Sequence, residues 1–329
     1  MIKIQTFNET HIEDARELAI DCYNEERHVV TALPYINSIP AAAYEEFATN
    51  GLGVVMLDDD NMLGFLCCHT PWDGAFGTVA KGTFVPVHAH GAVVENKGNI
   101  YKKLYQAAAD VWVANDIAYH TIGLYAHDNI AIEAFFTCGF GSRCVDAVRP
   151  MATFEYIAKP ASPTKLIFNE IVQSDAAVLR DLRTALNQHL GESPCFMRSS
   201  QAQEEDWIVR AEGRDSRLYA AYESGLVSPV AFIEVTADGE NFATEDDTML
   251  NICGAFCLPT HRGKGIMQGL LNYVITQLKA GDATKNITCL GVDFESFNLS
   301  SNAFWLKHFT AYTYSVTRRI DECALRRHG

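Results

Sequence analysis

The sequence predicts an α/β protein built from two consecutive domains, each a mixed and mostly antiparallel sheet flanked by helices. Strand-like and helix-like segments occur in the same order twice, in halves of about 160 residues, which indicates a duplicated fold. Between the halves, the stretch 159–164 contains two prolines, which disfavour helix and sheet alike and are typical of a linker. In the second half, a long apolar strand is followed directly by a glycine-rich turn and an amphipathic helix. The predicted domains are therefore 1–158 and 165–329.

The composition narrows the classes of partner. The 329 residues carry a net charge of −15, which argues against nucleic acid or an anionic membrane surface as a partner. No apolar run approaches ~20 residues and the N-terminus lacks the pattern of a signal peptide, so we expect no membrane span and a cytoplasmic protein. The ten cysteines are scattered, many of them within apolar strands, which favours reduced thiols. No second ligand pair follows Cys253 and Cys257 at zinc spacing, so we expect no metal.

In the first half, apolar spacing and turn residues define the elements. Asn8 or Thr10 can cap a helix whose inner face includes Ile12, Ala15 and Leu18. An acidic turn at 58–61 joins the two strands of a hairpin. The predicted elements are strand 2–7, the capped helix, helix 41–49, hairpin strands 53–57 and 62–69, strand 83–94, helix 100–114, strand 121–126 and helix 130–137.

The second half repeats this order. Its long apolar strand ends before Pro259, because proline has no N–H for the ladder. The predicted elements are strand 165–169, helices 175–188 and 202–212, hairpin strands 217–222 and 229–235, strand 249–258, a helix from 266 to 279, strand 287–293, helix 299–307 and strand 312–319.

The turn between the apolar strand and its helix has the features of a phosphate site. It reads Arg262-Gly263-Lys264-Gly265, and the helix begins immediately afterwards. The first turn of a helix presents unpaired N–H groups at the positive end of the dipole, and glycines let a phosphate approach them. Neither the P-loop pattern nor the dinucleotide-binding pattern fits this spacing. We call residues 262–267 the phosphate cradle; the alternative is an ordinary turn.

The order strand–Pro–x–x–Arg–Gly–Lys–Gly resembles motif A of the GNAT acetyltransferases, (R/Q)-x-x-G-x-(G/A), which holds the pyrophosphate of acetyl-CoA. Arg262 and Gly265 match, whereas Met267 stands where that family usually has glycine or alanine. The order of elements in both halves also resembles this family. The resemblance implies two tandem GNAT-like domains and an acyl-CoA-dependent N-acyltransferase, in which an acetyl group passes from acetyl-CoA to the amine of a small molecule.

The resemblance also implies which residues bind acetyl-CoA, the expected co-substrate. Pantetheine would pair with the edge of the strand at 255–257, where a backbone N–H can donate to the thioester oxygen. The pyrophosphate would lie on the amides that follow Arg262. Asn298 matches the asparagine that contacts pantetheine, and it can equally be the N-cap of the next helix. The implied binding residues are Ala255, Phe256, Cys257, Arg262, Gly263, Lys264, Gly265, Ile266, Met267 and Asn298.

The sequence leaves more than one candidate for the groups that transfer protons. Glu234 is the first candidate for the base and Asp293 the second, although a carboxylate at such a position is more often solvated or paired within a hairpin. Trp305 stands where the family usually has a tyrosine, and an indole N–H is not a usable acid. Tyr312 or Tyr314 would then protonate the leaving thiolate, unless water does so.

The first half has a degenerate cradle. In the stretch 95–101 only Gly98 remains of the paired glycines, with Lys97 beside it. We therefore expect the second half to be active. His88 and His90 share one strand face, and hydrogen-bonded buried histidines are favoured over a metal or ligand pocket. The alternative to an enzyme is a non-catalytic acyl-CoA binding or sensing protein; the sequence identifies neither the acceptor nor the oligomeric state.

Overall fold

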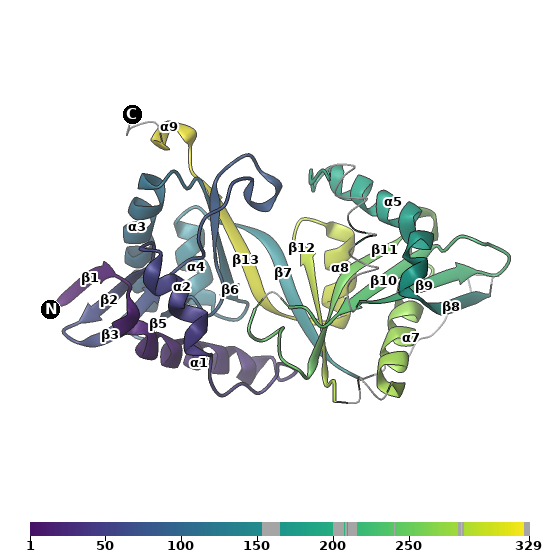
Figure 1. The fold of residues 1–329 in the computed structure, drawn as a ribbon, viewed down its shortest axis with the longest axis horizontal. Helices are drawn as coiled ribbons and strands as arrows, with labels where there is room; N and C mark the ends of the chain where they lie inside the picture. Colours follow the sequence, from purple (N-terminus) through teal and green to yellow (C-terminus); the bar gives the residue numbers. More distant parts are fainter. Residues whose placement is uncertain are drawn as a thin grey trace. The chain divides into compact units, whose positions relative to one another are not determined.

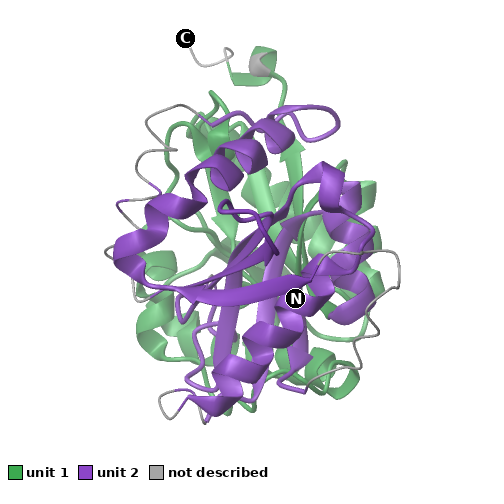
Figure 2. Ribbon diagram, turned by 90° about the vertical axis from the view of Figure 1, so that its right-hand side faces the viewer, with its two compact units in different colours: residues 1–146, 310–329 green, residues 147–309 purple. Residues whose placement is uncertain are grey.

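The chain forms two compact units, which are coloured separately in Figure 2. The computed structural model describes residues 1–152, 165–199, 207, 209, 216–239, 241–281, 284 and 286–325. Unit 1 contains residues 1–146 and 310–329, and unit 2 contains residues 147–309. The predicted linker at 159–164 and most of the predicted helix 202–212 lie outside the described residues.

Unit 1 contains most of the elements predicted for the first half, and in addition the C-terminal strand. They are β1 (Ile2–Thr6), η1 (Glu9–His11), α1 (Ile12–Val29), η2 (Ala41–Tyr44), α2 (Glu45–Thr49), β2 (Val54–Asp58), β3 (Asn61–Leu66), η3 (Ala75–Gly77), β4 (Gly82–Val85), β5 (His90–Ala92), α3 (Lys97–Ala114), β6 (Tyr119–Tyr125), α4 (Asn129–Thr137), β13 (Thr310–Arg319), α9 (Glu322–Leu325) and the first part of β7 (Gly141–Pro150), a strand that passes from unit 1 into unit 2 after Asp146 (Figure 1).

Two features of unit 1 differ from the sequence prediction. The predicted strand 83–94 is two strands, because the chain turns at Pro86, whose carbonyl accepts from the Ala89 N–H at 2.8 Å. Strand β4 pairs with β6 in the order β4–β6–β13–β7, whereas β5 pairs with β3 in the order β1–β2–β3–β5. Strand β13 pairs antiparallel with β6, so the two units divide the chain at different residues from the predicted domains 1–158 and 165–329.

Unit 2 contains one mixed sheet with helices on both faces. Its strands follow the order β12–β11–β10–β9–β8. Helix α5 packs on one face through an apolar cluster that includes Leu182, Leu218 and Phe232, and α7 covers the opposite face (Figure 1). The elements are β8 (Leu166–Ile171), η4 (Gln173–Leu179), α5 (Arg180–Gly191), β9 (Arg217–Glu223), β10 (Ala231–Thr236), β11 (Met249–Cys257), η5 (Pro259–His261), α7 (Ile266–Ala280), β12 (Cys289–Glu295) and α8 (Leu299–His308).

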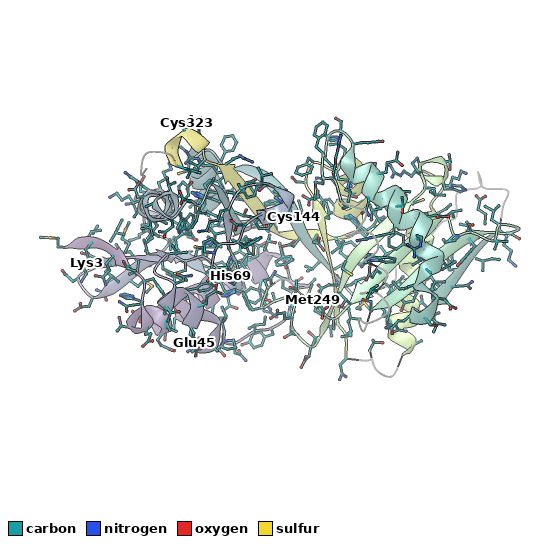
Figure 3. The ribbon with its side chains drawn as sticks, turned by 45° about the horizontal axis from the view of Figure 1, so that its top comes forward. Lys3, Glu45, His69, Cys144, Met249 and Cys323 are labelled. Atoms are coloured by element: carbon teal, nitrogen blue, oxygen red, sulfur yellow. The ribbon has the colours of Figure 1, made fainter. Side chains whose placement is uncertain are left out.

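The two central strands of unit 2 separate part of the way along. Strand β12 pairs with β11 only from Met249, labelled in Figure 3, to Ile252, although β11 continues to Cys257. The separation begins where the β10–β11 register shifts, leaving Cys253 as an extra residue in β11. We call residues 253–257 the open edge, because β12 does not pair with them. None of the helices in the described ranges is long and apolar enough to cross a membrane.

Candidate functional site in unit 2

The phosphate cradle has the predicted local structure. Gly263 has φ +74° and Gly265 has φ +81°, values in the left-handed region that side chains rarely adopt. Helix α7 begins directly afterwards at Ile266, with Gly265 as its N-cap residue. The turn therefore depends on both glycines to reverse the chain between β11 and α7. The apolar residues that recur at helical spacing along this helix are all buried: Ile266, Leu270, Leu271, Val274 and Leu278.

Backbone N–H groups at the start of α7 are available to a ligand. The Gly269 N–H donates to the Gly265 carbonyl at 2.9 Å, which is the first bond of the helical pattern. The N–H groups of residues 266–268 precede this bond and have no helical acceptor. In front of Gly263 the space is open, since a Cβ built there would meet no atom within 4 Å. A phosphate oxygen can therefore approach the backbone here.

The open edge of β11 presents backbone groups next to the cradle. The Leu258 N–H donates to the Val230 carbonyl at 3.0 Å, toward the β10 side. The Cys257 carbonyl accepts from Arg262 Nε at 3.0 Å on the other side. Because successive residues of a strand alternate in direction, Ala255 also directs its N–H and carbonyl toward the open edge.

A cavity of about 380 Å³ adjoins both features. Helix α5 contributes one part of its wall, the open edge and the cradle another, and α8 a third. Apolar side chains and a few polar groups line it together, which is typical of a small-molecule site. The lining residues are Leu186, His189, Ala255, Phe256, Cys257, His261, Arg262, Gly263, Gly265, Ile266, Met267, Gln268, Asn298, Ser300, Ser301, Ala303, Phe304, Trp305, Lys307 and His308.

The structure thus brings together the predicted binding residues, with the exception of Lys264, which does not line the cavity. Arg262 is folded back along the strand, with its guanidinium carbon 5.3 Å from the centre of the Phe256 ring. Asn298 is the N-cap of α8, as one interpretation of the sequence predicted, and its side chain accepts from the Ser301 N–H at 3.4 Å. Its contact with pantetheine stays a prediction.

Glu234 is anchored rather than free. Its side chain is 2% exposed, and Oε2 accepts from the Trp207 indole N–H at 2.9 Å. A Cβ built at Gly254 would lie 3.1 Å from Glu234 Oε2 and 3.2 Å from Arg183 Nη1. The glycine therefore leaves room for a carboxylate and a guanidinium beside the strand. Glu234 is not among the residues that line the cavity.

The other predicted proton carriers are not gathered at the cavity. Asp293 is exposed on β12 and does not line it. Tyr312 belongs to unit 1, where it is 0% exposed, and its carbonyl accepts from the Ala126 N–H at 2.8 Å. Tyr312 does not line the cavity. Trp305 lines the cavity and packs on Phe309 with ring centres 5.3 Å apart. No tyrosine is among the described residues that line the cavity.

Three histidines at the cavity were missed by the sequence analysis. His189 lies on α5, one helical turn after Leu186. The predicted helix ended at residue 188, directly before it. His261 lies 3.6 Å from a Glu223 carboxylate oxygen. His308, on α8, is 3.2 Å from the amide nitrogen of Gln268, and burial lowers the pKa of its imidazole with help from neighbouring cations. Helical spacing from Leu186 and from Trp305 could have placed His189 and His308 on the same inner faces.

In unit 1, charged side chains of the protein itself fill the space at the start of α3, the position that corresponds to the phosphate cradle at the start of α7. Lys97 begins α3, is 5% exposed, and its ammonium lies 3.0 Å from an Asp128 oxygen and 3.2 Å from a Glu25 oxygen. His90 bridges β5 and β6, because its Nε2 lies 2.7 Å from the Gly123 carbonyl. Burial lowers the pKa of His90 to about 4, which favours the neutral ring. The hydrogen-bonded buried histidine predicted at this position is confirmed, and the described residues contain no group of three or more side chains arranged to hold a metal ion.

Comparison with known proteins identifies the fold of this site. Residues 180–309 match the model of the Acetyltransferase (GNAT) family. No curated protein sequence matches the chain. Among solved structures, a GCN5-related N-acetyltransferase from Sphaerobacter thermophilus aligns over 97% of this chain and 95% of its own, with 11% identity and a TM-score of 0.58. A glucosamine N-acetyltransferase region of a fungal multi-domain β-N-acetylglucosaminidase aligns over 96% and 38%, with 12% identity and a TM-score of 0.52. At these identities the two likenesses establish the fold alone.

Proposed function

We propose that the protein is an acyl-CoA-dependent N-acyltransferase with unit 2 as its active part, a proposal supported by the match of residues 180–309 to the model of the Acetyltransferase (GNAT) family. In this proposal an acetyl group moves from acetyl-CoA to the amine of a small molecule. The observation that carries it is the open edge of β11, which leads into the phosphate cradle and lines the same cavity.

The residues present fit acetyl-CoA. The N–H groups of residues 266–268 and the open space at Gly263 would hold the pyrophosphate, and the open edge would pair with pantetheine. When bound, acetyl-CoA supplies a thioester whose acyl carbon can accept an amine. The Ala255 N–H would donate to the acyl oxygen and so stabilise the negative charge that develops there. The Arg262 side chain, held by the Cys257 carbonyl, keeps positive charge beside the cradle.

Unit 1 is proposed to bind no CoA. The Lys97 ammonium and its two carboxylates lie at the start of α3, the position that corresponds to the cradle at the start of α7. A ligand would have to displace a buried ion pair there, which costs several kcal/mol. The proposal therefore includes one CoA per chain.

A non-catalytic acyl-CoA binding or sensing protein is the second candidate. Trp305 favours it, because its indole lines the cavity where the family usually has a tyrosine and can donate a hydrogen bond but not a proton. Binding would then occur without turnover.

Two measurements test these proposals. Thermal shift with acetyl-CoA and CoA reports binding, because a ligand that binds the native state raises its melting temperature. Release of free thiol from acetyl-CoA, measured with a panel of polyamines, aminoglycosides and amino acids, reports transfer. A shift with amine-dependent thiol release supports the enzyme, and a shift without release supports the sensor. The absence of any shift would refute both, and calorimetry showing two equivalent CoA sites would refute the inactive unit 1.

A further inference from the structure

His189 lines the cavity, and one of its ring nitrogens has no hydrogen-bond partner among the described residues. It lies near the end of α5 and lines the cavity together with Leu186. Its ring centre is 6.1 Å from that of Phe256, the residue that follows Ala255 on the open edge. Its Nε2 atom is shielded from solvent and has no hydrogen-bond partner among the residues that the structure describes.

An unsatisfied buried polar atom is costly, and most such atoms in native proteins have a partner. Where the atom also lines a ligand cavity, a group of the ligand can supply the missing bond. The other polar side chain considered for this region, Glu234, already accepts a bond from Trp207 and does not line the cavity. His261 is beside Glu223 and His308 is beside Gln268. Of these groups, His189 is the one whose geometry leaves it available to a ligand.

We propose that His189 is the side chain that contacts the acyl group, donating from Nε2 to the thioester carbonyl oxygen together with the Ala255 backbone N–H. This assignment rests on the proposed function. Two donors converging on one oxygen form the usual arrangement that stabilises an acyl-transfer transition state. Ala255 lines the cavity from the sheet edge and His189 lines it from α5, so the oxygen would lie between two different elements.

The role leaves the proton balance of transfer unchanged. The neutral amine nitrogen forms a bond to the acyl carbon and the carbon–sulfur bond breaks. The nitrogen loses one proton and the leaving thiolate takes up one proton, so that the products are an amide and the free thiol of CoA. The imidazole keeps its Nε2 proton throughout and acts as a donor only. The Nε2 donor contacts the carbonyl oxygen already in the bound substrate. Acetyl-CoA, which has this carbonyl, should therefore bind more tightly than CoA, which lacks it.

The experiment compares acetyl-CoA with CoA by calorimetry on the full-length protein. His189→Phe keeps a ring against Phe256 but removes the donor, so acetyl-CoA affinity should fall about three- to tenfold, the effect of one neutral hydrogen bond. CoA affinity should stay within about twofold. His189→Gln restores an N–H donor and should recover most of the acetyl-CoA affinity. Gln188→Ala, at the exposed neighbouring residue, should change neither affinity.

Each alternative outcome contradicts the assignment. Equal weakening of both ligands in His189→Phe would show that the ring only packs against the cavity, and unchanged affinities would show that it makes no contact. Failure of His189→Gln to recover affinity, with a melting temperature like that of the wild type, would also overturn it. If the wild-type protein binds neither ligand, the proposed function fails and this inference fails with it; if it binds both and only the variants behave differently from expectation, the function stands.

Discussion

A negative charge at the start of α7 would test the phosphate cradle directly. Gly265 is the N-cap of this helix and has φ +81°, so the backbone next to the cavity is held in a left-handed conformation. Gly265→Asp places a carboxylate at that point. Aspartate adopts left-handed backbone more readily than most residues, and the strain is about 1 kcal/mol. The substitution therefore changes charge far more than it changes the fold.

The expected loss follows from the bonds at risk. A hydrogen bond from backbone N–H to a phosphate oxygen is charge-assisted and worth roughly 1.5–3 kcal/mol. Loss of one or two such bonds at the start of α7 lowers CoA affinity about ten- to a thousandfold. Stability changes less, because the strain is partly offset by a favourable interaction between the carboxylate and the helix dipole of about 0.3–1 kcal/mol. For a unit of this size that corresponds to a fall in melting temperature of at most about 4 °C.

Calorimetry with CoA and thermal melting, both on the full-length chain, provide the assay. Gly265→Ala introduces the strain without the charge and should weaken CoA much less. In unit 1, Asn96 is the N-cap of α3 with φ +61°, so Asn96→Asp is a matched control and should leave CoA affinity unchanged. If Gly265→Asp bound CoA as tightly as the wild type, residues 262–267 would be only a turn, and the proposed function would lose its main support.

Three further predictions address unit 1 and the chemistry. Lys97→Met leaves the Asp128 carboxylate without its cation and should cost about 3 kcal/mol in urea unfolding while one CoA still binds per chain; a second CoA site would contradict this. Burial lowers the pKa of His90 and of His120 to about 4, so the unfolded state binds more protons between about pH 6.5 and 4. Stability should be full above pH 6.5 and fall below it by up to about 1.4 kcal/mol per pH unit for each histidine, and a flat profile in urea unfolding would refute this. Trp305→Tyr provides a phenol that can protonate the leaving thiolate and should raise amine-dependent thiol release tenfold or more, a change that a pure sensor would not show.

Helices and strands could be predicted from the sequence where the residues of the element itself carry the pattern. Apolar spacing predicted a helix beginning at Ile266, and α7 begins there. The splitting of strand 83–94 had a local signal in Pro86, which was not used. The pairing of β13 with β6 had none, because strands far apart in the sequence pair through tertiary packing. The units differ from the predicted domains at two places, because unit 2 already begins at Ala147 and the chain returns to unit 1 at Thr310.

The same distinction between local and long-range signals explains which parts of the candidate site could be predicted from the sequence. The cradle and the open edge are contiguous in the sequence, so a pattern within 255–267 could indicate them. The cavity wall formed by α5 comes from a segment some 70 residues earlier, and no pattern links His189 to Ala255. Tyr312 was proposed from its position after Trp305 in the sequence, but β13 carries it into unit 1.

A comparison of the two helix starts shows what a CoA site requires of a sequence. Both α3 and α7 follow a residue in left-handed conformation, so the backbone turn is present in both units. In unit 1 the next residue is Lys97, whose buried ammonium is bonded to two carboxylates, and the position N-terminal to the turn is Glu95. In unit 2 the turn contains Gly263 and Gly265, the space in front of Gly263 is open, and a cavity adjoins the turn. A helix N-terminus attracts an anion only if no side chain already occupies the space and neutralises the charge. By that criterion the replacement of glycine by larger residues, rather than loss of the fold, separates the unit proposed to bind CoA from the one that is not.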